Sequence, residues 1–368
     1  MKSGTITAIV MTFLAITPVE GWTCPLCNLS EGDTILTELD SARTAVLAEL
    51  VRPPLSADKQ NATTGYRIVE VLKAGQWGKA GDTIDLPLVI PSTVGSVHLL
   101  LEKSDKPGHW LHPRGLTASG QVFVRLAARL PLLSKNTNLE DRIHRLVFLR
   151  PYLISNDRQL ARSAYAEFAR APYADIKELA PVLNHRELLS WIELEQGGSS
   201  NRRLFFTLLG VCRNSNDIGF VKSVLDDRLA RGKSTELDAI IAAYITLAGV
   251  DALAEIDRRL LKPEDIPLKV RRAAVQALRF HADCETVIEK ERVIASSRLL
   301  LNDPKSADFV IGDLARWKDW KSLDAILELW DKHKAQKHWL KQPIVNYLEE
   351  CPLPEADLAL DSIRQSDP

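Results

Sequence analysis

The chain has almost no net charge and little sulfur. Its 368 residues include 47 basic and 48 acidic side chains, so the formal net charge is −1 at pH 7. Such a balance creates no field that attracts nucleic acid or an anionic membrane, and we expect no nucleic-acid partner. Only 5 cysteines occur in the whole chain. They are too few for the dense disulfide framework of small secreted domains.

Common catalytic motifs are also absent. The chain contains no Gly-x-Ser-x-Gly, no Gly-x-x-x-x-Gly-Lys, no Gly-x-Gly-x-x-Gly and no His-Glu-x-x-His. These motifs mark the hydrolase elbow, the phosphate-binding loop, the dinucleotide fold and the zinc protease helix. The sequence therefore predicts a protein that is not an enzyme, with no catalytic residue, no metal and no cofactor.

No hydrophobic run near the start of the chain is long enough to span a bilayer. Lys2 precedes an apolar run of 11 residues, Ile6–Ile16, which ends before Pro18. A membrane span needs about 20 such residues, whereas the core of a signal peptide needs about 7–15. Modest side chains up to Gly21 predict a signal peptide over residues 1–21. We expect an exported protein, periplasmic or extracellular, with no stable membrane anchor after cleavage.

Two regions of different composition follow. Trp22–Lys135 contains 12 basic and 11 acidic residues, whereas residues 136–368 contain 34 and 36. The charge density rises at Leu130–Glu140, which predicts a boundary there. We therefore expect a small β domain over residues 22–135 and an α-helical domain over residues 136–368.

The first region has the pattern of a small β domain. Short apolar runs alternate with turn-forming residues, and Ile35–Ala42 predicts one short helix. Five strands in so short a region are typical of a closed or partly open barrel of the oligonucleotide/oligosaccharide-binding type, with a three-layer sandwich as the alternative. The expected strands are Ala45–Val51, Tyr66–Leu72, Thr83–Leu88, Val97–Leu101 and Val122–Leu126.

The second region has the pattern of helices that repeat. Apolar residues at i, i+3, i+4 and i+7 predict amphipathic helices, and Asp157–Arg170 and Leu268–Phe280 resemble the second helix of HEAT-type repeats. A period of 32 to 36 residues is typical of helix-hairpin solenoids, so we expect an all-α HEAT-like solenoid. Acidic residues that mark this period by opening helices are Asp217, Asp251, Asp283, Asp319 and Glu355.

Cys24-Pro25-Leu26-Cys27 is the most specific local motif. We interpret it as a structural cystine, because the sequence around it lacks the strand that precedes a thioredoxin motif. A redox-active pair is the first alternative, and a metal site or two free thiols are further ones.

The other three cysteines are widely spaced. Cys212, Cys284 and Cys351 lie 72 and 67 residues apart, which is about two repeats each. Helices stacked about 10 Å apart would separate them by roughly 20 Å, beyond the roughly 7 Å that a disulfide allows. We predict that they are not paired with one another.

Two further groups of residues have a plain and a functional interpretation. His109 and His112, with Asp105 nearby, are expected to be exposed loop residues, and the alternative is a metal site. Four tryptophans in the last repeats are expected to pack in the core, and the alternative is a partner-binding groove. These are Trp317, Trp320, Trp330 and Trp339.

The layout resembles a group of exported bacterial proteins of uncharacterised activity. That group combines a Cys-Pro-x-Cys N-terminus, a small β domain and HEAT-like helices. The β region also resembles a netrin-like domain, as in tissue inhibitors of metalloproteinases, which implies an inhibitor function. Here Trp22 and Thr23 would precede Cys24, so the N-terminal cysteine of that mechanism is not in place. The stretches that carry the first resemblance are Thr23–Cys27, Tyr173–Ala180, Arg279–Phe280 and Asp313–Leu323.

The features together favour an exported, non-enzymatic scaffold that binds an unknown protein partner on the concave face of the solenoid. A thiol–disulfide redox protein using Cys24 and Cys27 is the alternative from another class. A netrin-like inhibitor or ligand-binding module is the third hypothesis.

Overall fold

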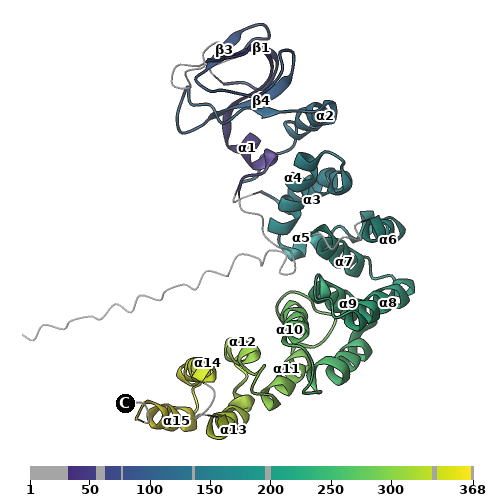
Figure 1. Cartoon of the computed structure of the whole chain (residues 1–368), viewed down its shortest axis with the longest axis vertical. Coiled ribbons are helices and arrows are strands. Elements are labelled where there is room, and N and C mark those ends of the chain that lie inside the picture. The colour runs from purple at the N-terminus through teal and green to yellow at the C-terminus, as the bar shows by residue number, and fades with distance from the viewer. Residues whose placement is uncertain are drawn as a thin grey trace, which may run out of the picture.

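The computed structural model combines an antiparallel sheet with a long row of helices (Figure 1). The mixed β and α organisation expected from the sequence is therefore present. The predicted signal peptide, residues 1–21, lies outside the part that the structure describes. The described residues are 32–54, 63–75, 78–134, 137–194, 200–333 and 338–365.

The sheet has the strand order β3-β2-β1-β4-β5, with every neighbouring pair antiparallel. The two edge strands, β3 and β5, do not pair with each other in the described residues, so a closed barrel is not confirmed. The strands are β1 (Ala42–Arg52), β2 (Thr64–Lys73), β3 (Thr83–Leu86), β4 (Val97–Lys103) and β5 (Arg114–Gly115).

The central strand β1 is buried on both faces. Ala45 and Leu47 face the core that continues into the helices, whereas Val46 and Ala48 face a second, smaller core inside the curled sheet. This division follows from the strand geometry, because successive side chains point to opposite faces. Irregular pairing in β1, between Ala45 and Val46 and again between Leu47 and Ala48, helps the sheet to bend around the small core.

Four of the five strand predictions are confirmed, and the fifth is wrong. Val122–Leu126 belongs to helix α2 (Ala118–Ala127). Thr117 caps the helix by accepting a hydrogen bond from the Gly120 N–H at 3.0 Å. Buried residues recur with helical spacing at 120, 123, 124 and 127, while Val122 is 52% exposed. The apolar run was too short to distinguish a strand from an amphipathic helix.

The remaining helices follow α1 (Ile35–Ser41), which confirms the short helix expected at 35–42. One hydrophobic core runs from Ile35 to Ile363, so sheet and helices share it. The helices are α3 (Leu139–Leu149), α4 (Arg158–Arg170), α5 (Tyr173–Lys177), α6 (His185–Leu194), α7 (Ser200–Cys212), α8 (Ile218–Ala230), α9 (Leu237–Ile256), α10 (Leu268–Asp283), α11 (Lys290–Arg298), α12 (Asp308–Arg316), α13 (Leu323–His333), α14 (His338–Glu350) and α15 (Pro354–Gln365).

The helices stack in a curved row (Figure 1). Helices α10, α12 and α14 lie along its inner side, and α13 and α15 lie on the outer side. Helix α9 bends at Gly249, whose φ of 63° is in the left-handed region that glycine tolerates.

The acidic residues expected to open helices do so at four of five positions. Asp217 precedes α8, Asp251 follows the bend in α9, Asp319 precedes α13, and Glu355 lies in the first turn of α15. The prediction is wrong for Asp283, which ends α10. Asp283 instead accepts a hydrogen bond from the Trp317 indole at 2.8 Å and pairs with Arg316. Its position in the 32- to 36-residue period therefore reflects a contact between helices.

One stretch has the length and apolar character of a membrane span. Leu237–Leu261 combines α9 with a short π-helical turn, and 61% of its most apolar window is buried inside the fold. The core helix of a globular fold has these same properties, and α9 packs between α7 and α10.

A buried polar cluster joins the sheet side to the helices. Arg145 of α3 donates to Glu167 of α4 at 3.1 Å and pairs with Asp40 of α1 at 2.9 Å. The Thr34 hydroxyl donates to Glu167, and the Ser163 hydroxyl accepts from the backbone N–H of Ile35 at 3.1 Å. Burial raises the pKa of Asp40, although Arg145 lowers it. The single arginine therefore pairs with carboxylates from two different helices.

Replacing Arg145→Ala is expected to lower the free energy of unfolding by about 3–5 kcal/mol, because it leaves Glu167 and Asp40 without their cation. Urea denaturation measures this loss. Arg52→Ala is the matched control: the Arg52–Asp85 pair is about half exposed, and its loss should cost less than about 1 kcal/mol. Equal losses for the two variants would contradict the role given to Arg145.

A buried histidine joins α9 to α10 and gives a second prediction. The Nε2 atom of His281 lies 3.1 Å from the carbonyl oxygen of Ala242, and burial lowers the pKa of His281 to about 4. The unfolded chain takes up this proton near pH 6.5 but the folded chain does not, so stability falls as pH drops from 6.5 to about 4.

His281→Gln should remove about 2–3 kcal/mol of that pH-dependent loss of stability. Urea denaturation at pH 7 and at pH 4.5 compares the variant with the parent chain and with His112→Gln, whose imidazole is exposed. If the parent chain and His281→Gln lose the same stability between the two pH values, the lowered pKa of His281 is not the cause of the pH dependence.

Candidate functional site

Ion pairs and hydrogen bonds between successive helices recur at nearly constant sequence separation. Each joins residues 32 to 35 positions apart, which is the period that the acidic residues indicated. We call this set the inter-helix ladder. Its pairs are Arg142–Asp175, His185–Asp217, Arg203–Asp238, Lys222–Glu255, Asp226–Arg259, Asp257–Arg292, Arg271–Asp303, Arg279–Asp313 and Asp283–Arg316.

One pair of the ladder, Arg271–Asp303, is buried on both sides, whereas the other cations are partly exposed and pair with mostly buried carboxylates. Arg271 is 1% exposed and pairs with Asp303, while Ser306 accepts a hydrogen bond from it at 2.9 Å. Removing one member of such a pair strands a buried charge. The ladder therefore fixes how each hairpin stacks on the next.

A buried triad reinforces the stack between α7 and α9. Glu236 is fully buried, forms an ion pair with Arg202 at 3.0 Å and accepts a hydrogen bond from Arg228 at 2.6 Å. Its φ is 49°, which is a left-handed conformation uncommon for residues other than glycine. The triad places the start of α9, including Asp238, against α7.

Four charged residues occupy matching places near the start of four helices. Arg203, Asp238, Arg272 and Asp308 lie on α7, α9, α10 and α12, with separations of 35, 34 and 36 residues. The signs alternate along this charge row. Arg203 pairs with Asp238, and the Arg272 guanidinium lies 4.8 Å from the centre of the Phe309 ring.

A pocket of about 360 Å³ lies along the charge row, between α9 and α10. It presents three cationic side chains and one carboxylate, together with a hydroxyl and an amide. These groups suit the recognition of a polar ligand. We call it the inner pocket. Its lining residues are Arg203, Ser234, Asp238, Lys269, Arg272, Ala273 and Gln276.

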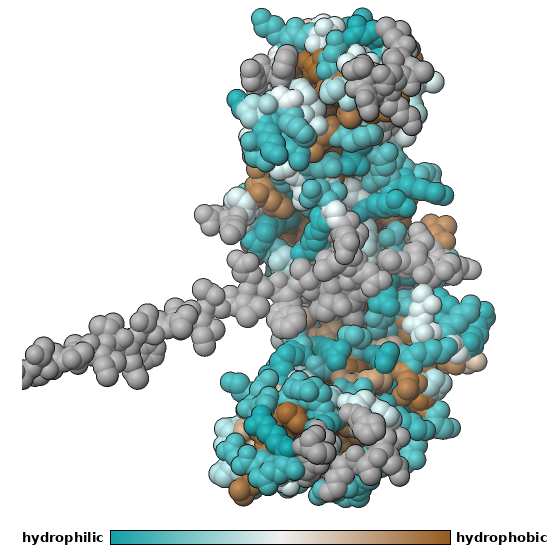
Figure 2. Space-filling model, turned by 60° about the vertical axis from the view of Figure 1, so that its left-hand side comes forward, coloured by the Kyte–Doolittle hydropathy of each residue, from teal (hydrophilic) through white to brown (hydrophobic). Residues whose placement is uncertain are grey.

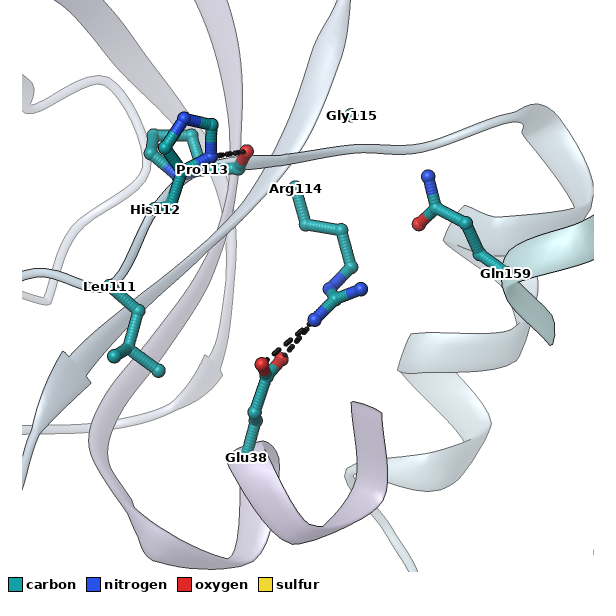
Figure 3. A pocket seen from close by; sticks show the side chains of 7 residues that line it. All are labelled: Glu38, Leu111, His112, Pro113, Arg114, Gly115 and Gln159. Carbon is teal, nitrogen blue, oxygen red and sulfur yellow. Dashed lines mark hydrogen bonds and ion pairs between the residues drawn. The ribbon is translucent and has the colours of Figure 1, made fainter. Parts of the chain in front are cut away.

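A second pocket, of about 450 Å³, lies where α1, β5 and the start of α4 meet (Figure 3). Arg114 points across it and binds both oxygens of Glu38, at 2.7 and 2.8 Å. The pairing neutralises the charged groups that face each other there. The Nδ1–H group of His112 donates to the Pro113 carbonyl at 3.2 Å, and Gln159 lines the opposite wall.

The metal interpretation of the two histidines finds no support in the geometry. Asp105, His109 and His112 are exposed residues of the loop between β4 and β5, as the plainer interpretation expected. Within the described ranges, no cluster of three or more histidine, cysteine, aspartate or glutamate side chains is arranged to hold a metal ion.

Three of the four tryptophans pack against the core. Trp317, Trp320 and Trp330 are partly buried there, whereas Trp339 is 49% exposed. The Trp320 ring meets the ring of Tyr347 edge-on, with centroids 5.5 Å apart. The expectation of core packing is confirmed for these three and wrong for Trp339, which lies in the first turn of α14 with a side chain that points outward.

The cysteines divide between the described and undescribed parts. Cys24 and Cys27 lie outside the described residues, so the predicted cystine stays a prediction. Cys212, Cys284 and Cys351 are free thiols, which confirms that they are not paired with one another. Burial raises the pKa of Cys212 and of Cys284 to about 11, so neither is an activated nucleophile.

Comparison with protein-family models, with curated proteins and with solved structures finds no match to this chain. The function is therefore argued from the geometry.

The charge row and the inner pocket were not foreseen from the sequence, although the signal was present. The acidic residues expected to mark the period are those that open helices, whereas Asp238 and Asp308 belong to a different position of the same period. Arginines at the same spacing, Arg203 and Arg272, would have shown that the period includes charges of both signs.

The state of the three free cysteines gives a third prediction. At pH 8, iodoacetamide should modify Cys212 and Cys284 in the native protein at least tenfold more slowly than an exposed thiol, because their raised pKa values keep them protonated. In urea, intact mass should show that all three, including Cys351, react. A native reaction as fast as that of glutathione would contradict the burial.

Proposed function

We propose that this chain is a non-enzymatic scaffold whose helical hairpins form a HEAT-like α-solenoid that binds a protein partner. The inter-helix ladder is the observation that carries the proposal. Repeats joined at constant separation, over one continuous core, give a long and stiff surface. Such surfaces are suited to holding an extended partner, with no need for a catalytic centre.

The surface chemistry supports recognition by polar groups. On the face drawn in Figure 2, hydrophilic residues predominate and hydrophobic ones form small separate patches. A large apolar interface of the obligate kind would show a continuous apolar strip. The charge row instead offers alternating charges along the stack.

The curled sheet fits the role of an end cap, and we propose that it is a partly open barrel of the oligonucleotide/oligosaccharide-binding type. The first helices would expose apolar side chains if nothing covered them. Leu47 and Leu99 of the sheet and Phe123 of α2 share one core with Leu146 of α3. A solenoid needs such a cap at its ends to stay soluble.

Export through the predicted signal peptide completes the proposal. The scaffold would then act in the periplasm or outside the cell.

Two matched variants test the scaffold. Gln276→Trp places a bulky side chain at an exposed position of the inner helix α10, and Ala325→Trp does the same on the outer helix α13. Cross-linking of the full chain in its native compartment identifies partners by mass spectrometry, and the strongest is then purified for binding measurements.

We expect Gln276→Trp to weaken binding of the purified partner at least tenfold, because it obstructs the inner surface, and Ala325→Trp to change it less than twofold. Cross-links should map to the inner helices. The absence of any stoichiometric partner, or equal effects of the two variants, would refute the scaffold.

A further inference from the structure

Two neighbouring members of the charge row carry opposite charges but do not form an ion pair in the described residues; we call this position the open rung. Arg203 and Asp238 are joined by an ion pair, but Asp238 and Arg272, on the next two helices, are not joined in the part of the chain described. The inner pocket lies between them. Elsewhere in the ladder, opposite charges at this separation meet directly, as Arg271 and Asp303 do. The open rung has room for a group that would bridge it.

Asp238 lines the pocket and has one acceptor atom without a partner. Its side chain is 8% exposed; one carboxylate oxygen accepts from Arg203, and the other, Oδ1, is buried with no hydrogen-bond partner. The backbone N–H groups of Asp238 and Ala239 lie near the carboxylate, but neither donates to Oδ1 with good geometry. Burial raises the pKa of Asp238, although Arg203 and these amides lower it. A ligand that donates a hydrogen bond there would satisfy the oxygen.

The opposite wall presents unused donors. The exposed guanidinium of Arg272 is held over the ring of Phe309 and has no hydrogen bond or ion pair in the described residues. Its planar edge is free to bind a carboxylate through two parallel hydrogen bonds. Lys269, one turn earlier, donates to the Gly232 carbonyl at 2.7 Å, which leaves two further N–H groups on its ammonium.

The charges around the pocket select the ligand. Arg203, Lys269 and Arg272 outnumber the one carboxylate that lines it. Asp308 lies beyond Arg272, close enough to interact with it electrostatically, and its Oδ1 is also buried without a partner. A phosphate dianion would meet the repulsion of these carboxylates and has no N–H to give Asp238. A peptide carboxylate carries one charge and lies a few bonds from a backbone N–H.

We propose that the inner pocket binds an aspartate or glutamate side chain of an extended acidic segment in the protein partner. The carboxylate pairs with Arg272 and Lys269, and a backbone N–H of the same segment donates to Asp238 Oδ1. The inference rests on the proposed scaffold function, since it names the chemistry of what the scaffold holds.

Fluorescence anisotropy of the full chain with a labelled, acetylated and amidated hexaglutamate peptide tests the pocket. Hexaglutamine of the same design is the neutral control probe. We expect Arg272→Gln and Lys269→Gln each to weaken hexaglutamate binding at least tenfold, because each removes a cation that faces the ligand. Lys262→Gln removes an exposed cation that does not line the pocket and should change binding less than twofold. Urea denaturation confirms that each variant is folded.

Each other outcome decides against the pocket. Equal weakening by Lys262→Gln would show attraction to general surface charge, and hexaglutamine binding as tightly as hexaglutamate would exclude recognition of the carboxylate. Displacement of the peptide by equimolar inorganic phosphate would show a site for any anion. No binding of hexaglutamate at all would also overturn the proposal.

The two proposals fail in different ways. Partner binding that survives Arg272→Gln unchanged would remove the pocket from the interface and leave the scaffold standing. Specific hexaglutamate binding by a chain that has no protein partner would leave the pocket and remove the scaffold.

Discussion

The described helices bury their apolar faces against one another in one shared core, and the other properties of the stack depend on this constraint. Each hairpin must lie on its neighbours, and one core therefore extends from the sheet to the last helix. Apolar packing alone has little directional preference. The inter-helix ladder adds direction, because an arginine and an aspartate meet only when the two helices have one particular offset. Hydrophobic burial supplies most of the stabilisation, and the ladder determines the register.

The same constraint explains how the sheet and helices are joined. The helices nearest the sheet need a cover, and the face of β1 that carries Ala45 and Leu47 supplies it. The polar cluster around Arg145 crosses this contact, so the cover is fixed by charge as well as by apolar area. The sheet is thus part of the stack, although its composition differs from that of the helical region.

Features with a local signal were predictable from the sequence, and those that depend on distant contacts were not. Strands such as Val97–Lys103 and helices such as α10 follow from the alternation or the 3.6-residue period of their own residues. Val122–Leu126 was assigned as a strand because five apolar-rich residues fit either period. The helix became clear only from the capping by Thr117 and from the face that Phe123 buries.

The candidate site illustrates the same limit. Its residues come from α7, α9, α10 and the loop before α9, which are too far apart in the sequence to form one short motif. The sequence holds the spacing between Arg203 and Asp238, yet it does not show that the next rung, towards Arg272, is open. An open rung depends on the path of Arg272 over Phe309, which is a packing detail. The motif that seemed most specific, Cys24–Cys27, lies outside the described residues.

Glu236 illustrates how charge can override backbone preference. At its φ of 49° glycine is the residue with least strain, and an L-residue costs on the order of 1 kcal/mol more. Yet glycine has no carboxylate, and two buried arginines, Arg202 and Arg228, depend on the one that Glu236 provides. The residue best suited to the turn is thus the one the core excludes. Substitutions at position 236 should therefore depend on Arg202 and Arg228 and not on the backbone conformation. We expect Glu236 to be replaced only when both arginines are replaced as well.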